Sequence, residues 1–323
     1  MRVLNNINIL FSSVGRRVEL VKYFREAKEK LNIDGNLIGI DIDELAPALN
    51  FVDRKYIVPR LNNENFIPTI IDICKKESIS LIIPTIDTEL DIYAKNKKLI
   101  EKETGTRVMV CDENIISIVR DKIKTNIFLK LNGFDVPRVV TEKDIKNKNY
   151  SFPLFIKPSD GSSSINAFKI ENFEELMFFK SYVPNPIIQE FVDGTEYCVD
   201  VFSDLDSNII TVVPKLRLAQ RSGEITKAKI IKDREIIELG KKLAKTLNAQ
   251  GEINFDCIKT NNGVKIIEIN ARFAGGAPIS FKSGANSAEK IYRYLLGEKI
   301  EYNEEYKDGL IALRFDDAIF LNE

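Results

Sequence analysis

The sequence predicts a mixed fold, in which an α/β unit with a parallel sheet comes first and an α+β region follows. Up to about residue 112, short apolar runs alternate with amphipathic segments, which is the pattern of a doubly wound parallel sheet. Beyond residue 112 the pattern changes, because helical segments are followed by pairs of apolar strands joined by short turns. These two observations predict the fold class, α/β and α+β.

The composition is that of a globular protein with room for two or three domains, since 44% of the 323 residues are hydrophobic and 29% are charged. With 47 basic and 48 acidic side chains the net charge is -1, so the overall charge attracts neither nucleic acid nor an anionic membrane. The start has no secretory signal pattern, and no apolar run reaches the length of a membrane span. We therefore expect a cytoplasmic protein.

Two residue types narrow the possible chemistry. The sequence has no histidine, which excludes a catalytic triad with histidine, a histidine-ligated zinc site and a histidine base. Carboxylates, lysines, arginines and backbone amides remain for any chemistry. The cysteines are scattered without paired spacing, and we expect buried, reduced thiols. They are Cys74, Cys111, Cys198 and Cys257.

In the first unit, strands are expected at 7–13, 36–43, 80–87 and 107–112, and helices at 16–30, 65–78 and 89–103. Ligands of such sheets bind beyond the carboxyl ends of the strands. The turn "SSVGRR" at the first strand end has one glycine where a dinucleotide fingerprint has three, so it is a weak nicotinamide motif. Anion binding at the helix start and a simple packing turn at Gly15 both remain open.

The stretch "YSFPLFIKPSDGSSSINAFKI" follows two helical segments that end at Asn132-Gly133. An apolar strand ends in Lys157 and Pro158, a small hydroxyl-rich turn follows, and the chain returns as a strand. Backbone N–H groups of such a turn can close on phosphate oxygens, and the lysine adds a point charge. Taken alone, the motif fits a phosphate flap or an ordinary hairpin.

In "PIIQEFVDGTEYCVDVF", an apolar strand leads to Gln189 and Glu190, and a new strand carries Glu196 after Gly194. Exposed backbone from 190 to 192 could read an adenine edge, and Glu196 could hold ribose hydroxyls. A solvated hairpin with acidic residues is the alternative.

In "GEINFDCIKTNNGVKIIEINARFAGG", Asn254 and Asp256 lie on one face of a strand, and the "TNNG" turn brings a second strand alongside. That strand carries Glu268, Asn270 and Arg272 at alternate positions, so these three also share a face. Carboxylate and amide oxygens are ligands suited to Mg²⁺, and burying two carboxylates without a cation would be costly. The alternative is a polar sheet face open to water.

In this order the motifs resemble the ATP-grasp superfamily, in particular short relatives of the large subunit of carbamoyl phosphate synthase. The resemblance rests on "RDK" in the helical connector, "IKP", the glycine-serine turn, "QEFVDGTE" and "EINAR", and it covers nearly the whole chain. It implies a Rossmann-like pre-ATP-grasp domain over 1–112 and an ATP-grasp domain over 113–323, with subdomains 113–186 and 187–323. One departure is Ala271, where many relatives have proline, so the exit of this strand is expected to be looser.

The resemblance implies ATP and Mg²⁺ as cofactors, with Mn²⁺ as a substitute. Its implied catalytic residues are Arg272 and Lys157, and its metal ligands are Asp256, Glu268 and Asn270, with Asn254 as the alternative to Asp256. Its implied nucleotide-binding residues are Arg120, Lys157, Gly161, Ser162, Ser163, Ser164, Gln189, Glu190, Phe191, Val192, Glu196 and Lys227.

The implied function is a ligase that activates a small carboxylate as an acyl phosphate for attack by an amine. A non-catalytic ATP-binding regulator of the same fold is the alternative, whereas a nicotinamide-dependent oxidoreductase would leave everything after Asp112 unexplained. A chain with a single grasp unit is not expected to make carbamoyl phosphate. The expected partners are small carboxylates and amines rather than nucleic acid or membrane, and a homodimer remains open.

Substrate residues are expected at the first unit's strand ends, in the basic segment 215–229 and at the final glycine pair. The candidates are Ser13, Arg16, Asp87, Glu89, Arg217, Arg221, Gly275 and Gly276. The segment 215–229 is expected to be mobile, with a solvated charged loop as its alternative.

Overall fold

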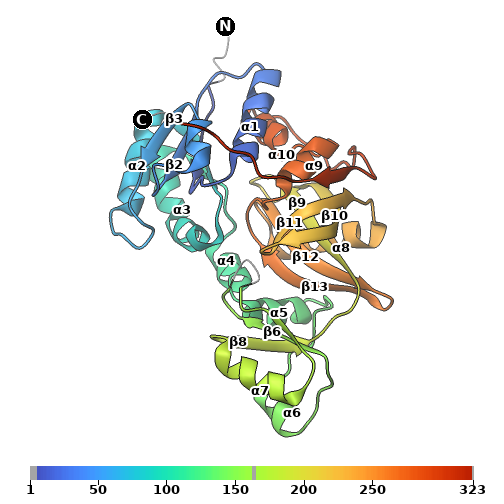
Figure 1. Ribbon diagram of the computed structural model, residues 1–323. Coiled ribbons are helices and arrows are strands. Elements are labelled where there is room, and N and C mark those ends of the chain that lie inside the picture. The colour runs from blue at the N-terminus through green and yellow to red at the C-terminus, as the bar shows by residue number, and fades with distance from the viewer. Residues whose placement is uncertain (1–5, 162–164, 322–323) are drawn as a thin grey trace.

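The computed structural model describes residues 6–161 and 165–321 and contains three sheets (Figure 1). The first sheet is parallel, with strand order β3-β2-β1-β4-β5. Its strands are β1 (Asn8–Ser12), β2 (Leu37–Asp41), β3 (Arg54–Ile57), β4 (Ile79–Pro84) and β5 (Arg107–Val108). Helices α1 (Val18–Lys30), α2 (Phe66–Glu77) and α3 (Leu90–Thr104) flank it, with short 3-10 turns η1 (Pro47–Asn50) and η2 (Asp87–Glu89).

The strand order of this sheet reverses between β1 and β4. All five residues of β1 are buried, because helices cover both faces of the sheet. The alternation of strands and helices predicted for this part of the chain is confirmed, whereas β3, a short and largely exposed edge strand, was not expected from the sequence. The carboxyl ends of β1 and β4 therefore border the crevice where ligands of such sheets bind.

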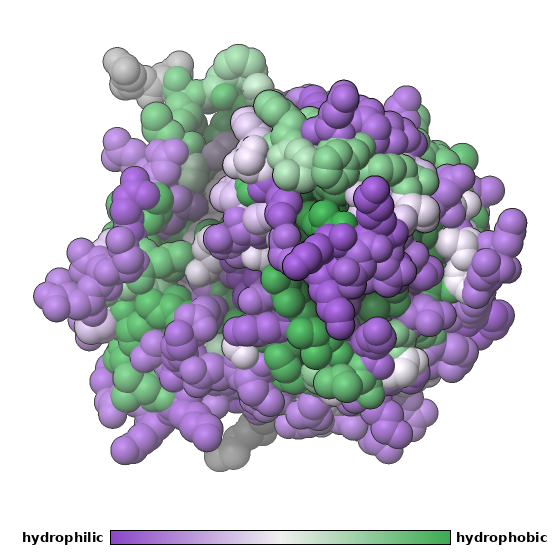
Figure 2. All heavy atoms as spheres, turned by 90° about the horizontal axis from the view of Figure 1, so that it is seen from below, coloured by the Kyte–Doolittle hydropathy of each residue, from purple (hydrophilic) through white to green (hydrophobic). Residues whose placement is uncertain are grey.

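A helical connector leads from the first sheet to a small antiparallel sheet of order β7-β6-β8. The elements are α4 (Glu113–Val119), α5 (Lys122–Leu131), α6 (Glu142–Lys146), β6 (Leu154–Pro158), β7 (Phe168–Ile170), α7 (Phe173–Tyr182) and β8 (Pro186–Glu190). This end of the molecule faces the viewer in Figure 2, where hydrophobic residues (green) lie between hydrophilic ones (purple). Exposed side chains of α7, among them Phe173, Met177 and Phe178, are of this apolar kind.

The largest sheet is antiparallel, with order β13-β12-β9-β10-β11-β14. Its strands are β9 (Thr195–Ser203), β10 (Ile209–Arg221), β11 (Glu224–Ile230), β12 (Gly251–Thr260), β13 (Gly263–Asn270) and β14 (Ile311–Leu313). The remaining helices are α8 (Arg234–Leu247), α9 (Ala277–Ser283) and α10 (Ser287–Leu295). Side chains such as Val199, Val201 and Phe255 pack with α8 in the core on one face, and the opposite face carries polar side chains.

The basic segment 215–229 is not a loop, and this corrects the expectation from its charge. It forms most of the β10–β11 hairpin, whose turn residues Ser222 and Gly223 have φ of 51° and 75°. Two positive φ values in succession suit a tight turn between twisted strands. Ala228 and Ile230 of the returning strand are buried in a small hydrophobic cluster. This packing holds the segment as a strand in spite of its charged side chains.

An aromatic cluster joins the first sheet to the end of β13. Phe24 of α1 packs edge-on against Phe11 of β1 at 5.0 Å between ring centroids, and against Phe273 at 6.1 Å. Phe273 is fully buried and also contacts Phe281 of α9. Because Phe273 follows Arg272, the cluster fixes that arginine near the carboxyl ends of β1 and β4.

In the described parts of the chain, no helix is both long and apolar enough to cross a membrane. All four cysteines are buried and unpaired.

Candidate functional site

The polar face of the largest sheet brings the predicted metal residues together. In the β12–β13 pair, Asp256 lies opposite Glu268 and Asn254 lies opposite Asn270. Glu196 of β9 lies one step further along the same face, opposite Ile258. The residues that alternate with these polar groups along the strands are apolar and buried. Because successive side chains of a strand point to opposite faces, the polar groups lie on the face away from α8.

Arg217 binds two of these carboxylates. Its Nη1 lies 2.8 Å from Glu196 Oε1 and its Nη2 lies 3.0 Å from Asp256 Oδ1, and the side chain is 8% exposed. Burial alone would lower the pKa of Arg217, but Asp256 and Glu196 outweigh it and raise this pKa. Arg217 was expected in a mobile substrate-binding segment. Instead it lies on β10 and pairs with Glu196, the candidate for ribose binding, and with Asp256, a candidate metal ligand.

Lys157 and Lys122 approach the same face from the small sheet and the connector. Lys157, at the end of β6, is 7% exposed, and its Nζ lies 3.5 Å from the main-chain oxygen of Ile267. Lys122 Nζ lies 3.2 Å from Glu268 Oε1 and also donates to the main-chain oxygen of Gly161. Burial lowers the pKa of Lys157, Lys122 lowers it further, and Glu268 opposes this shift.

Lys122 was missed by the sequence reasoning, which chose Arg120 from the same "RDK" motif. Arg120 is half-buried at the end of α4, whereas Lys122 is the first residue of α5 and contacts Glu268 directly. Asp121 caps α5 by accepting from the backbone N–H groups of Ile123 and Lys124, which orients Lys122 toward the sheet. Asp121 lies between Arg120 and Lys122, and an aspartate is a typical helix N-cap. This sequence signal could have shown that Lys122 begins a new helix.

The donor set fits a hard divalent cation such as Mg²⁺. Asp256, Glu268 and Asn270 offer two carboxylates and an amide oxygen on neighbouring strands. Asp256 Oδ1 is buried and, among the described residues, makes an ion pair but no hydrogen bond. Within those same residues no group of three or more His, Cys, Asp or Glu side chains could hold a metal, so Asn270 would have to take part.

Asn254 belongs to a buried network rather than to the open part of this face. Its Nδ2 donates to the main-chain oxygen of Val199 at 3.1 Å and to Asp200 Oδ1 at 2.9 Å. Ser280 Oγ donates to Asp200 Oδ2 at 2.6 Å, and Lys215 pairs with the same carboxylate. These contacts support Asp256 over Asn254 as the first metal ligand.

The stretch expected to read adenine is partly engaged within the protein. Gln189 is buried, the N–H of Glu190 donates to Arg138 O at 2.9 Å, and the N–H of Phe191 donates to Pro153 O at 3.2 Å. Contacts from this stretch to a base would therefore come from its carbonyl oxygens and from half-buried Val192.

The small and large sheets are also joined near this stretch, because Glu190 Oε1 lies 2.6 Å from Lys265 Nζ. Burial raises the pKa of Glu196, and Arg217 opposes that shift. Ser162, Ser163 and Ser164 lie outside the described residues, while Lys227 is exposed on β11.

Arg272 and Asp87 meet from opposite ends of the chain. Arg272 Nη2 lies 2.7 Å from Asp87 Oδ2 and 3.5 Å from Asn270 Oδ1. Gly275 follows closely, and a side chain there would meet the Glu224 carboxylate at 3.1 Å. Gly276 O accepts from buried Lys215 at 3.4 Å. The Arg272–Asp87 pair thus connects the end of β13, which carries two of the metal candidates, to the end of β4.

Arg17, which the sequence reasoning did not select, lies beside this pair. Its Nη2 donates to the main-chain oxygen of Thr85 at 3.1 Å, two residues before Asp87. The neighbouring Arg16 was chosen instead, but its side chain is 82% exposed and pairs with Asp316 at 3.4 Å. Arg221 also pairs with Asp316, at 2.8 Å, and is exposed.

The other candidates at the first sheet have internal roles. Glu89 is fully buried and accepts from Ser12 Oγ at 2.6 Å and Ser13 Oγ at 2.8 Å, so it holds the ends of β1 and β4 together. The N–H of Gly15 donates to Asp41 Oδ2 at 2.8 Å, so a protein carboxylate already occupies this donor at the helix start.

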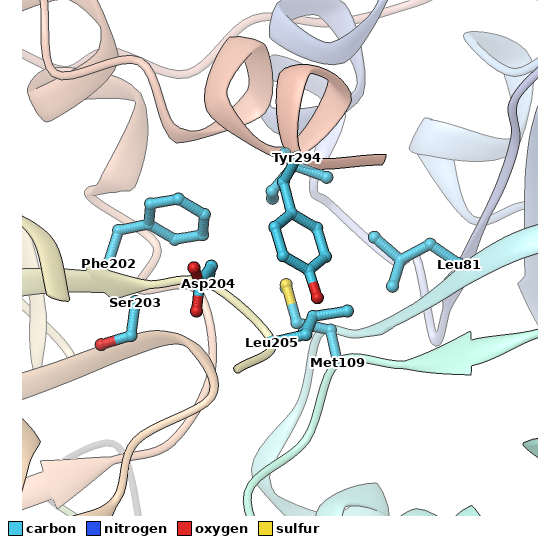
Figure 3. A pocket seen from close by; sticks show the side chains of 8 residues that line it. Leu81, Met109, Phe202, Ser203, Asp204, Leu205 and Tyr294 are labelled. Carbon is cyan, nitrogen blue, oxygen red and sulfur yellow. The ribbon is translucent and has the colours of Figure 1, made fainter. Parts of the chain in front are cut away.

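Two hollows lie away from this face. A cavity of about 10 Å³, room for about one water molecule, is lined mainly by apolar side chains from the first sheet, the β9–β10 turn and α10 (Figure 3). A shallow groove lies between α2 and α3. Neither is lined by Lys157, Lys122 or Arg217.

Comparison with known proteins agrees with this arrangement. A family model of the PylC-like N-terminal domain matches residues 9–114, and a model of the ATP-grasp domain matches residues 119–276. The carbamoyl phosphate synthase large chain of a Thermoanaerobacter species is 28% identical over 229 residues, which are 64% of this chain and 21% of that protein. The 3-methyl-D-ornithine--L-lysine ligase of Methanosarcina mazei is 26% identical over 228 residues, which are 68% of this chain and 58% of the ligase.

The chain thus spans about a fifth of the first relative and little more than half of the second. Among solved structures, the biotin carboxylase domain of Hydrogenobacter thermophilus 2-oxoglutarate carboxylase, in complex with MgADP, has a TM-score of 0.74 at 16% identity. The match covers 94% of this chain and 73% of that domain and shows a shared fold. With a PylC-like N-terminal domain followed by an ATP-grasp domain, the chain belongs to the ATP-grasp superfamily.

Proposed function

We propose that the protein is an ATP- and Mg²⁺-dependent ligase that activates a small carboxylate as an acyl phosphate for attack by an amine. The observation that carries this proposal is that two lysines from outside the large sheet contact β13, since Lys122 pairs with Glu268 and Lys157 donates to Ile267 O. Asp256 lies opposite Glu268, and Arg272 follows two residues after the end of β13. A plain polar sheet face has no need of cations delivered from the connector and from the small sheet.

In this proposal Lys157 and Lys122 bind phosphate oxygens of ATP. Charge-assisted contacts of this kind are strongest where water is excluded, and both side chains are largely buried. Arg120, Lys227 and the turn 161–164 remain proposed nucleotide contacts from the sequence motifs. Carbonyl oxygens near Glu190 would receive the adenine amino group, and Glu196 the ribose hydroxyls.

Asp256, Glu268 and Asn270 would hold the metal. Mg²⁺, or Mn²⁺ in its place, would neutralise charge that builds up on the transferred phosphoryl group. Arg272 lies next to Asn270 and would bind that phosphoryl group or the carboxylate that receives it.

The chemistry balances without histidine. A carboxylate oxygen bonds to the γ-phosphorus as the bond to ADP breaks, and the amine nitrogen then bonds to the acyl carbon as phosphate leaves with the C–O bond electrons. The ammonium loses two protons as it becomes an amide: one ends on the departing phosphate and the other is released. The ligase from Methanosarcina mazei is named for joining two amino acids, which supports this reaction class for the present chain.

The test is ATP-dependent phosphate release measured over a panel of amino acids and small carboxylates, with the protein in Mg²⁺ and again in excess chelator. We expect release that needs both the metal and at least one panel pair. ATP binding without any release across the panel would instead indicate a non-catalytic ATP-binding regulator.

The Glu268→Gln variant is the sharpest control for that assay. It keeps the size of the side chain but removes the charge beside Lys122, so turnover should fall to background while the protein stays folded. Glu171→Gln, an exposed position in the small subdomain that pairs with Lys169, should retain activity. Metal-dependent turnover that survives Glu268→Gln would overturn the metal assignment. Analytical ultracentrifugation of the wild-type protein tests whether it forms a homodimer.

A further inference from the structure

Arg17 lies at the crevice where the strand order of the first sheet reverses. It precedes α1, and its guanidinium reaches across from the end of β1 to the end of β4, where Nη2 donates to Thr85 O at 3.1 Å. Thr85 Oγ1 donates back to Ser13 O at 2.7 Å, which joins the two strand ends. Such switch points are where open α/β sheets bind their ligands.

Two carboxylates that influence Arg17 are already paired with other arginines. Asp87 pairs with Arg272 at 2.7 Å, and Glu224 pairs with Arg314 at 3.3 Å. Within the described part of the chain Arg17 has no ion-pair partner. Asp87 and Glu224 thus each pair with another arginine, and an incoming anion would give Arg17 a partner of its own.

The pKa of Arg17 is consistent with the lack of a carboxylate partner among the described residues. Burial, followed by the nearby Arg272, lowers the pKa of Arg17 to about 10, against the opposing effects of Glu224 and Asp87. Arg17 therefore stays charged at neutral pH, but its charge is under-compensated. A ligand anion would stabilise the charged form.

Arg272 and Arg17 contact different parts of the protein. Arg272 lies 3.5 Å from the metal candidate Asn270, so it is next to the reacting group in the proposed mechanism. Arg17 contacts the first sheet at Thr85. The contact between Phe24 of α1 and Phe273, the residue after Arg272, holds the two guanidinium groups in a fixed relation.

We propose that Arg17 binds a carboxylate of the substrate that is not consumed in the reaction. This inference rests on the proposed ligase function, because that function defines which carboxylate is consumed. The group would belong either to the amine, as in an amino acid, or to a dicarboxylate whose other end is activated. In both cases Arg17 is a specificity-determining residue that contacts substrate.

Calorimetric titrations in the presence of a non-hydrolysable Mg·ATP analogue test this. The probes are amino acids and small dicarboxylates, each compared with its derivative in which one carboxylate is a neutral amide. For the wild-type protein we expect binding of at least one acid, and on the order of ten- to a hundredfold weaker binding of its amide. Whether the sensitive carboxylate lies on an amino acid or on a dicarboxylate identifies its source.

For Arg17→Met we expect the acid and the amide to bind equally weakly, with affinity for the Mg·ATP analogue unchanged, and Arg17→Lys should recover part of the difference. The matched control is Arg25→Met, which removes a half-buried arginine within α1, paired with Asp53 at 2.8 Å. It should keep the preference for the acid even if the melting temperature falls.

The proposal is overturned if no acid binds, if acid and amide bind wild-type protein equally, or if Arg17→Met keeps the preference. Loss of the preference in Arg16→Met but not in Arg17→Met would also overturn it. Phosphate release with the same probes is a separate readout. Binding that depends on Arg17 without release would contradict the proposed ligase and leave the carboxylate site standing.

Discussion

At the scale of single residues, Lys157 illustrates how a buried cation is maintained without ligand. A lysine at a strand end followed by proline would ordinarily carry its charge into water, yet this one is 7% exposed. Burial lowers its pKa, while Glu268 and Asp256 oppose the shift. A buried ammonium is costly unless it is compensated, so this position is suited to a group that meets negative charge on binding.

Lys157→Met is expected to weaken Mg·ATP binding by roughly ten- to a hundredfold, because a charge-assisted contact contributes roughly 1.5–3 kcal/mol. The melting temperature without ligand should not fall, since the variant replaces a buried charge by an apolar group of similar length. The increase in melting temperature on adding Mg·ATP should shrink.

Calorimetric titration of wild-type and variant proteins measures this, with Lys143→Met, an exposed lysine of α6 in the same subdomain, as the matched control. Equal affinities of wild type and Lys157→Met for Mg·ATP would return Lys157 to a purely structural role.

The two metal candidates on β12 should also behave differently. Asn254→Ala removes buried hydrogen bonds to Val199 O and Asp200, so the free energy of unfolding should fall by about 1–3 kcal/mol. Asp256→Asn should keep the fold but raise the Mg²⁺ concentration needed for half-maximal phosphate release. Denaturant unfolding and a Mg²⁺ titration of activity measure the two effects. A change in the Mg²⁺ requirement in Asn254→Ala alone would reverse the assignment.

At the scale of elements, the start of α5 positions a cation. Asp121 accepts from Ile123 N at 2.9 Å and Lys124 N at 3.1 Å, and Lys122 lies in the first turn beside it. Asp121→Ala should cost about 1 kcal/mol of stability, typical for the loss of an N-cap, and should also weaken Mg·ATP binding because Lys122 loses its fixed position.

Thr141→Ala is the matched control for this cap. Thr141 caps α6 in the same way, through Asp144 N at 3.2 Å, but lies away from the charged cluster. It should lower stability without affecting nucleotide affinity. Parallel chemical unfolding and calorimetry distinguish the cases, and nucleotide affinity unchanged by Asp121→Ala would show that Lys122 does not depend on this cap.

The sequence predicted the fold class and the pairing of Asp256 with Glu268, because both depend on local periodicity and on a short hairpin turn. It did not reveal Arg17 or Lys122. Arg16 and Arg17 are adjacent and chemically identical, and only the packing of α1 against Phe273 exposes one and half-buries the other. Contacts between residues 122 and 268 depend on how three sheets assemble, which local patterns do not encode.

At the scale of the whole molecule, a buried carboxyl group beside α10 couples stability to pH. Burial raises the pKa of Glu252 well above its ordinary value of 4.5, and Asp200 on β9 adds to this. Ser287, Lys215 and Lys290 oppose the shift. The folded state thus retains a proton that the unfolded chain releases, so stability is present below about pH 4.5 and is lost as pH rises toward the raised pKa.

The pKa of Lys290 shifts the other way. Burial lowers it to about 8, with Glu252, Glu289 and Glu305 opposing, so above that pH the unfolded chain binds more protons and stability recovers toward the ordinary lysine value. Glu252→Gln should flatten the loss of stability between pH 5 and pH 8, measured by denaturant unfolding at several pH values. Glu301→Gln, which changes an exposed glutamate paired with Lys299, should keep the wild-type slope. An unchanged slope in Glu252→Gln would assign the pH dependence to other groups.

The pairing of the metal candidates with protein cations has a consequence for the order of binding. Arg217 pairs with Asp256 and Lys122 pairs with Glu268, so both carboxylates already have protein counterions in the ligand-free protein. Free Mg²⁺ must compete with both cations, whereas a nucleotide that arrives with its metal gives the displaced ammonium and guanidinium groups new oxygens to bind. Metal and nucleotide should therefore bind with strong positive cooperativity, each strengthening the other by the same factor.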